Sequence, residues 1–141
     1  MNSAIRIGIV GAGEMGQRHA KLVADSNIAV MAGFADPDPS VALNPVFAKV
    51  RHYRDHLKLI KAETPDGIII AAPNAHHVPV AIDCLAAGIP VLLEKPVADS
   101  VESGHALVAE QRKSGVTVLV GHHRRFDPSV DATKRLINDG S

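Results

Sequence analysis

"IGIVGAGEMGQRHA", residues 7 to 20, decides the fold because three closely spaced glycines join a strand-like apolar run to a helix-like one. In this setting Gly11 allows a tight turn, Gly13 lets a pyrophosphate approach the backbone, and Gly16 lets the helix pack close to the strand. The N-terminus of that helix adds unpaired N–H groups and the positive end of its dipole. The stretch therefore predicts a dinucleotide-binding turn, with a plain structural turn as the alternative.

Apolar runs and helix-period stretches alternate along the rest of the chain. Short runs rich in Val and Ile, bounded by Gly, Pro or Asp, are typical of strands buried on both faces of a parallel sheet. They predict strands at 4–10, 28–35, 67–72, 89–94 and 116–121. Apolar residues recurring at three and four predict helices at 14–26, 55–63, 76–88 and 100–115. The alternation indicates a Rossmann-type α/β fold, a doubly wound parallel sheet in three α/β/α layers that forms a single domain over 1–141.

The segment 37–54 follows neither pattern, because it places three prolines within nine residues. Proline interrupts helices and central strands alike. We expect a loop with an irregular helix here, followed by a short edge strand near 50–53.

Composition narrows the choice of partners. The 141 residues carry 15 Lys and Arg against 15 Asp and Glu, which leaves no electrostatic footprint for nucleic acid or an anionic membrane. A small neutral or anionic ligand fits this balance better. Cys84 is the only cysteine, which excludes an internal disulfide and a thiolate metal cluster. Neither a membrane-length apolar run nor a signal-peptide layout is evident, so we expect a cytoplasmic protein.

Asp36 ends the second predicted strand, 20 positions after Gly16. A carboxylate there can accept hydrogen bonds from an adenosine ribose, and it would repel a 2'-phosphate. The next residues, Pro37 to Pro39, supply no cation to offset that repulsion. The sequence therefore favours NAD over NADP as cofactor. The alternative is that Asp36 simply starts the turn before Pro37.

The loop after the strand at 67–72 reads "AAPNAHH", residues 71 to 77. Ligands of open parallel sheets bind beyond the carboxyl ends of the strands, which makes this loop part of the expected site. Asn74 either caps the following helix or faces the cofactor. Of His76 and His77, one is expected to point to solvent. We expect no metal site here, since no cysteine or third ligand stands at a suitable spacing.

The run "VLLEKPVAD", residues 91 to 99, ends a buried strand on two charged residues and a proline. A strand that enters the ligand crevice can deliver Lys95 there, partly desolvated, to exchange protons or polarise a hydroxyl. Pro96 then ends the strand. Glu94 should point to the opposite side of the pleat from Lys95. The alternative is an ordinary surface lysine before a turn.

Three stretches together carry a family resemblance: "GAGEMGQRHA" (11–20), "APNAHHVPVAIDCLAAGIPVLLEKPVADS" (72–100) and "VGHHRRFDP" (120–128). In this order and spacing they closely resemble the amino-terminal domain of the Gfo/Idh/MocA family, the relatives of glucose-fructose oxidoreductase and inositol dehydrogenase. The resemblance covers nearly all of residues 4–130. It implies that Lys95 is the catalytic residue, beside the nicotinamide and the reacting hydroxyl.

The resemblance also implies further contacts. Pro73 and Asn74 lie along the cofactor in that family, and the family histidine corresponds to His77 rather than His76. His123, Arg124 and Arg125 are placed near the cofactor end of the site, although Arg125 has an alternative structural role in tying the next helix to the sheet. The full set of expected cofactor-binding residues is Gly11, Gly13, Glu14, Met15, Gly16, Asp36, Ala72, Pro73, Asn74, His77, Glu94, Lys95 and Arg124.

Members of the family carry a second domain that supplies the substrate pocket and further acid-base residues. The helix-like run after residue 128 would lead into that domain. Two explanations follow: a fragment of an NAD-dependent oxidoreductase, inactive by itself, or a free-standing dinucleotide-binding module. The first is favoured because Lys95 has no evident purpose in a pure binding module. The resemblance suggests sugars, polyols or inositols as substrates and allows a homo-oligomer.

Overall fold

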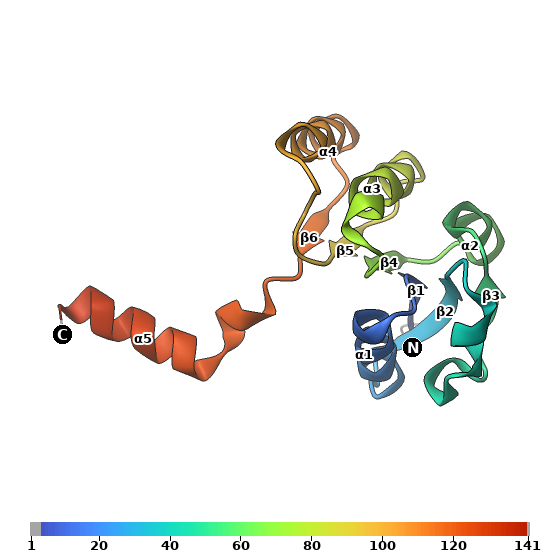
Figure 1. Ribbon diagram of the computed structural model, residues 1–141, viewed down its shortest axis with the longest axis horizontal. Helices are drawn as coiled ribbons and strands as arrows, with labels where there is room; N and C mark the ends of the chain where they lie inside the picture. Colours follow the sequence, from blue (N-terminus) through green and yellow to red (C-terminus); the bar gives the residue numbers. More distant parts are fainter. Residues whose placement is uncertain (1–3, 141) are drawn as a thin grey trace.

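The computed structural model describes residues 4–140, whose core is a six-stranded parallel sheet in the order β3-β2-β1-β4-β5-β6 (Figure 1). Every neighbouring pair of strands runs parallel. The strands are β1 (Ile5–Val10), β2 (Ala29–Ala35), β3 (His52–Tyr53), β4 (Gly67–Ile70), β5 (Val91–Leu93) and β6 (Val118–Val120). The predicted Rossmann-type fold is confirmed, and most of the strands are shorter than predicted.

Helices connect the strands in the expected alternation. They are α1 (Glu14–Ala24), α2 (His56–Glu63), α3 (His77–Ala86), α4 (Val101–Ser114) and α5 (Pro128–Asp139), with 3-10 turns η1 (Pro39–Leu43), η2 (Pro45–Phe47), η3 (Asn74–His76) and η4 (His123–Phe126). Asp55 and Ser100, predicted as the first residues of two helices, are instead their N-caps and accept backbone N–H groups of the first turn. The predicted domain ends, residues 1–3 and 141, lie outside the described residues.

The two faces of the sheet bury two separate cores. Ile9 and Ile69 face α1 and η2, where Phe34 stacks on Phe47 with ring centroids 4.2 Å apart. The residues that alternate with these along the strands, such as Val10, Ile68 and Ile70, face α2, α3 and α4. Figure 1 shows α1 on one side of the sheet and these three helices on the other. This arrangement is the predicted three-layer α/β/α sandwich.

The segment 37–54 has the irregular structure that its prolines predict. Pro39 and Pro45 each begin a 3-10 turn, since their missing N–H is not needed at the first position. The side chains of Asp38 and Asn44 cap these turns. The edge strand that follows is β3, shorter than the predicted 50–53.

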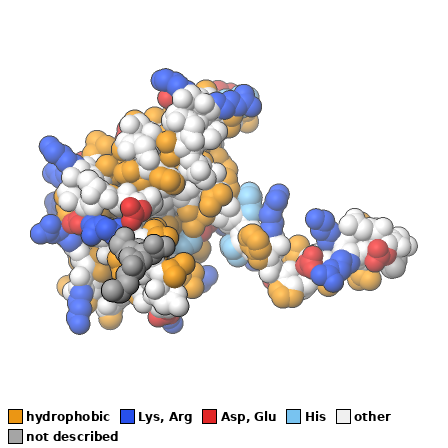
Figure 2. Space-filling model, turned by 180° about the vertical axis from the view of Figure 1, so that it is seen from behind, with side chains coloured by type: hydrophobic (Ala, Val, Ile, Leu, Met, Phe, Trp, Pro, Cys, Tyr) orange, Lys and Arg blue, Asp and Glu red, His pale blue; other side chains and the backbone are white. Residues whose placement is uncertain are grey.

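The end of the chain departs from the expected burial. Strand β6 is an edge strand and Leu119 in its middle is 61% exposed, so the expectation that all predicted strands are buried on both faces is wrong here. The reason is that α1 packs on β1, β2 and β4 and does not extend over β6. Beyond β6, η4 and α5 project from the body as an arm with exposed hydrophobic side chains (Figure 2).

Candidate functional site

The site begins where the connections of the sheet diverge, between β1 and β4. The chain leaves β1 for β2 on one side and leaves β4 for β5 on the other, which creates the crevice that binds ligands in such folds. The loops after β1 and β4 touch at this point. A Cβ atom on Gly11, whose φ is +90°, would lie 2.5 Å from the backbone nitrogen of Ala72. Only glycine fits there, as the tight turn predicted.

The glycine turn forms an open cradle at the start of α1. A Cβ on Gly16 would lie 1.9 Å from the carbonyl oxygen of Gly11, so helix and turn are in direct contact. A Cβ on Gly13 would meet no other atom of residues 4–140 within 4 Å. Gly13 is the N-cap of α1, and in the described part of the chain no side chain caps it. Open space beside unpaired N–H groups is what a pyrophosphate requires.

Glu14 and Met15 occupy the first turn of α1, beside this cradle. The carboxylate of Glu14 is turned to the helix surface, where it pairs with Arg18 at 2.6 Å. Its backbone N–H, rather than its side chain, is therefore the group that an anion could use. Met15 is half-buried and lines the hollow between α1, β5 and β6.

Asp36 follows β2 and bonds to two backbone groups. Oδ2 accepts a hydrogen bond from the N–H of Ala12 at 2.8 Å, and Oδ1 accepts one from the N–H of Asp38 at 2.9 Å. The second bond is the turn-starting contact that the alternative interpretation predicted. A carboxylate accepts about four hydrogen bonds, so capacity for ribose hydroxyls remains. Both interpretations of Asp36 are therefore compatible with one geometry.

Pro73 and Asn74 form the loop after β4, and both are exposed. Asn74 opens the turn η3, yet neither η3 nor α3 has a side-chain cap within the described residues. The capping alternative for Asn74 is thus wrong. Among residues 4–140 no hydrogen bond occupies its side-chain amide, which leaves the amide available to a ligand.

His76 points to solvent as expected, whereas His77 is buried. The ring of His77 is 1% exposed. Its Nδ1 lies 2.7 Å from the carbonyl oxygen of Pro96, and its Nε2 lies 2.8 Å from that of Ala72. Each ring nitrogen thus lies at hydrogen-bond distance from a carbonyl oxygen, and the ring lies between the loops after β4 and β5.

Glu94 and Lys95, the two charged residues at the end of β5, lie in different surroundings. Lys95 is exposed and lines a hollow with the residues from Gly121 to Arg125. Glu94 is 5% exposed, and its Oε1 lies 2.8 Å from Nε2 of His19 in α1. The predicted divergence of these two side chains is in keeping with this arrangement. His19 was not predicted as a site residue, and its only signal in the sequence is its position three residues after Gly16 on the helix.

Partners of Glu94 keep its buried carboxylate charged. Burial raises the pKa of Glu94, but hydrogen bonds from His19 and from the backbone N–H of Lys95 outweigh burial and leave the pKa below its ordinary value. The charge of His123 acts in the same direction. An ionised carboxylate is therefore built into the floor of the site.

Basic residues gather around Lys95. His123 and Arg124 belong to the turn η4, and with Arg125 they line the same hollow as Lys95. A larger hollow of about 530 Å³ adjoins it between α1, β5 and β6, with Glu94 and His19 among its lining residues. The two hollows share Gly121, His122 and His123. The carboxyl end of β5 thus opens onto one continuous, mixed polar and apolar surface.

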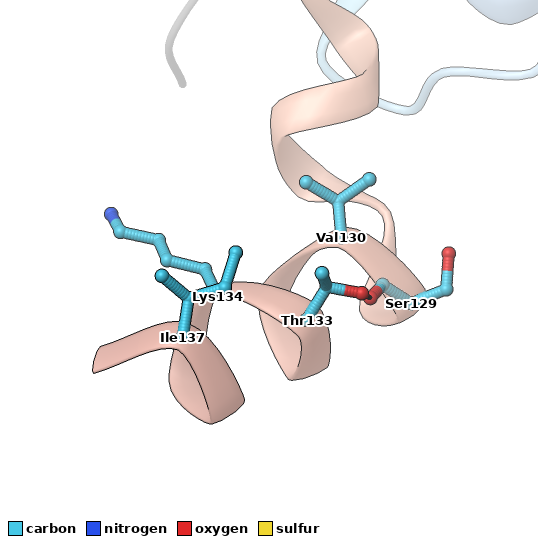
Figure 3. A pocket seen from close by; sticks show the side chains of 5 residues that line it. All are labelled: Ser129, Val130, Thr133, Lys134 and Ile137. Carbon is cyan, nitrogen blue, oxygen red and sulfur yellow. Dashed lines mark hydrogen bonds between the residues drawn. The ribbon is translucent and has the colours of Figure 1, made fainter. Parts of the chain in front are cut away.

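A further hollow lies on α5 and is unrelated to the crevice. Figure 3 shows its lining side chains, which project from this one helix: Ser129, Val130, Thr133, Lys134 and Ile137. Because these residues all come from an exposed helix at the end of the chain, the hollow is surface relief rather than a site.

Among residues 4–140 no helix is long and apolar enough to cross a membrane.

A glycine turn at a helix N-terminus, a carboxylate at the end of the second strand and a crevice at the switch point define a dinucleotide-binding domain. The chain matches the family model described as "Oxidoreductase family, NAD-binding Rossmann fold" over residues 5–122. It therefore belongs to the Gfo/Idh/MocA family and forms the NAD-binding domain of that family.

Relatives with curated descriptions are about a third identical to the chain over the part of them that aligns with it. The rhizopine catabolism protein MocA of Rhizobium meliloti is 36% identical over 137 residues, which are 96% of this chain and 43% of that protein. An inositol 2-dehydrogenase of Corynebacterium glutamicum is 32% identical over 147 residues, which cover 99% of this chain and 43% of the relative. The chain thus spans less than half the length of these relatives.

Solved structures of dehydrogenases have the same fold as the chain. The scyllo-inositol dehydrogenase of Lactobacillus casei, with bound NAD(H) and scyllo-inositol, superposes with a TM-score of 0.88 at 26% identity, covering 98% of this chain and 42% of that one. The WlbA dehydrogenase of Bordetella pertussis, in complex with NADH and UDP-GlcNAcA, gives a TM-score of 0.90 at 25% identity, covering 99% and 41%.

Proposed function

We propose that this domain binds NAD(H) for an oxidoreductase that acts on a carbon-bound hydroxyl of an inositol, a sugar or a related polyol. The observation that carries the proposal is the position of Lys95. It follows the carboxyl end of β5, one strand away from the switch point, and its exposed side chain lines a hollow with the residues from Gly121 to Arg125. The relatives named above, which include inositol dehydrogenases, support the class of substrate.

The first half of the domain holds the cofactor in this proposal. The N–H groups at the start of α1 bind the pyrophosphate, with Gly13 leaving the path clear. Asp36 accepts hydrogen bonds from the adenosine ribose, and its charge favours NAD over NADP. Ala72, Pro73 and Asn74 line the cofactor from the loop after β4.

The second half acts at the reacting end. NAD⁺, when bound, supplies the hydride acceptor. Lys95 exchanges a proton with the substrate hydroxyl, and its Nζ is the atom that receives or returns that proton. Arg124, in the same hollow, keeps the surroundings of this proton transfer positively charged, and His123 lies beside it. We assign no substrate contact to Glu94, whose carboxylate faces α1.

We further propose that the chain works as the amino-terminal domain of a two-domain enzyme in the cytoplasm, where the other domain supplies the substrate pocket. A homo-oligomer is compatible with this role, and neither nucleic acid nor a membrane is a proposed partner. A dinucleotide-binding module without catalysis is not favoured, because the relatives are dehydrogenases and related oxidoreductases.

The test uses the complete enzyme with this domain, NAD⁺ and a panel of inositols, sugars and linear polyols, and it follows NADH formation by absorbance. We expect turnover with at least one hydroxyl compound. Tight NAD⁺ binding without turnover on any member of the panel would support the module instead.

A further inference from the structure

The two neighbours of Lys95 are held by buried polar groups, while Lys95 itself is exposed. On the amino side, Glu94 is 5% exposed and bonded to His19. On the carboxyl side, the carbonyl oxygen of Pro96 lies 2.7 Å from Nδ1 of His77, which is 1% exposed. The backbone on both sides of Lys95 is therefore anchored to the protein interior.

The carboxylate of Glu94 brings three elements together at this point. Oε1 faces His19 of α1 at 2.8 Å, and Oε2 accepts the backbone N–H of Lys95 at 3.2 Å at the end of β5. A Cβ on Gly121, directly after β6, would lie 3.1 Å from Oε1. The carboxylate is thus confined by α1, β5 and β6 at once.

Burial of this carboxylate costs folding free energy, which suggests that the carboxylate has a function. A buried carboxylate loses its hydration, and an ion pair with good geometry often only compensates for that loss. An apolar side chain at residue 94 could pack between α1 and β6 without this cost. The group that the carboxylate does orient, through a direct hydrogen bond, is the backbone N–H of Lys95.

We propose that His19 and Glu94 are positioning residues for Lys95. They fix the backbone from which its side chain extends, and His77 fixes the same tripeptide from the other side. Neither touches the reacting hydroxyl. The inference rests on the proposed function of Lys95, and it adds a division of labour: the pair of partly buried His19 and buried Glu94 sets the place of the ammonium, and the exposed lysine moves the proton.

The chain contains a matched control for this pair. His56 of α2 lies 2.8 Å from Asp83 of α3, the same distance as between His19 and Glu94. That pair joins α2 to α3, and among residues 4–140 neither member hydrogen-bonds to residues 94–96. Loss of a histidine–carboxylate pair can thus be compared at two places, of which one adjoins Lys95.

Kinetics of the complete enzyme provide the first test. His19→Ala should lower kcat by at least tenfold and up to about 100-fold, the scale of a small misplacement of a catalytic group. His19→Gln keeps an amide donor for Glu94 and should restore kcat to within about threefold of the parent enzyme. His56→Ala should leave kcat unchanged. If His19→Ala fails to fold, His19→Asn replaces it, because its shorter side chain does not reach Glu94.

A double variant separates positioning from general stability. In the background of Lys95→Met, the change His19→Ala should lower kcat no further, because no lysine remains to be positioned. The proposal would be overturned if the two substitutions lowered kcat independently, so that their effects multiplied in the double variant. A kcat of His19→Ala within twofold of the parent enzyme would also overturn it. If Lys95→Met alone retains full turnover, the proposed function of Lys95 fails first, which distinguishes the two failures.

Amide hydrogen exchange gives a readout that does not depend on turnover. Exchange of the Lys95 N–H should accelerate at least tenfold in His19→Ala, because the freed carboxylate no longer holds it. The N–H of Glu94, which bonds to the carbonyl of Ile70, should change much less. Unchanged exchange at Lys95 in a folded variant would contradict the positioning role.

Discussion

The carboxylate of Asp36 accepts a 2.8 Å hydrogen bond from the backbone N–H of Ala12, in the middle of the glycine turn. The residue proposed to select the cofactor therefore also holds the turn that receives the pyrophosphate. This bond and the one from the N–H of Gly11 to the carbonyl oxygen of Ala35 join the ends of β1 and β2, and both support the position of the turn. Substitution of Asp36 should accordingly affect both selectivity and affinity.

Asp36→Asn should reduce the preference for NADH over NADPH. The parent chain should bind NADH at least tenfold more tightly, about 1.4 kcal/mol, because the carboxylate repels a 2'-phosphate. The neutral amide removes that repulsion, and the ratio should fall toward one. Titration calorimetry with both cofactors measures it. Asp25→Asn, at the far end of α1, removes the same charge as a control; equal selectivity loss there would refute the local explanation.

Gly13→Val should abolish NAD(H) binding in a chain that remains folded. A Cβ at Gly13 has open space around it, so the fold tolerates the side chain, which then occupies the path of the pyrophosphate. We expect an affinity at least 100-fold lower, or about 2.7 kcal/mol. Circular dichroism and calorimetry on the same sample separate folding from binding.

Gly16→Ala provides the contrasting case. Its Cβ would lie 1.9 Å from the carbonyl oxygen of Gly11, so the turn and α1 must separate. This variant should lose thermal stability as well as binding. Normal affinity in folded Gly13→Val, or an unaltered melting temperature in Gly16→Ala, would contradict the assignment of the turn.

Lys95→Met should lower kcat of the complete enzyme by roughly 100-fold or more, the usual scale of general acid-base catalysis. Methionine keeps much of the apolar stem and removes only the cation. Affinity for NAD⁺ should change less than about threefold, because the turn and Asp36 hold the far end of the cofactor. Near-normal turnover would return Lys95 to the role of a solvated charge at a strand end.

The variant Glu63→Gln should lose less free energy of unfolding in acid than the parent chain does. A hydrogen bond from Tyr53 is the main reason why the pKa of Glu63 lies below its ordinary value, and Arg6 and Arg51 lower it further. A carboxyl with a lowered pKa in the folded state stabilises the protein above its unfolded pKa, and this contribution disappears as the pH falls through the folded pKa. The parent should therefore lose more stability than Glu63→Gln does as the pH falls below 4.5, the ordinary pKa of the carboxyl, and through its lower folded pKa.

Thermal melts across this pH range measure the difference. Glu110→Gln is the matched control, because Glu110 is an exposed partner of Lys113 on α4. Identical acid dependence in the parent chain and Glu63→Gln would show that the cluster around Tyr53 does not contribute.

The parts of the fold that depend on local pattern could be predicted from the sequence. The glycine spacing at Gly11 to Gly16 and the strand–helix alternation led to the parallel sheet, since turn geometry and periodicity are properties of neighbouring residues. Strand ends were predicted less well, because an apolar side chain such as Ile89 can be buried beside a strand without belonging to it.

Features that depend on distant partners could not be predicted. His19 and Glu94 are 75 positions apart, and no periodic pattern in the sequence around either residue indicates that they form a pair. The ring of His77 lies between carbonyl groups of two loops that meet only in the fold, a contact that no local pattern in the sequence indicates. The exposure of Leu119 likewise follows from where α1 packs rather than from the strand itself.

The central claim is that NAD⁺ lies across the switch point, with its nicotinamide end at Lys95. Nitrogen-15 NMR of the isotope-labelled chain during titration with NAD⁺ tests it most directly, with nuclear Overhauser contacts to the nicotinamide ring recorded at saturation. The account predicts saturable shifts of the Gly13, Asp36 and Lys95 amides and contacts between the ring protons and the Lys95 side chain. Saturable shifts that spare Lys95, or ring contacts at the Asp36 end, would contradict it.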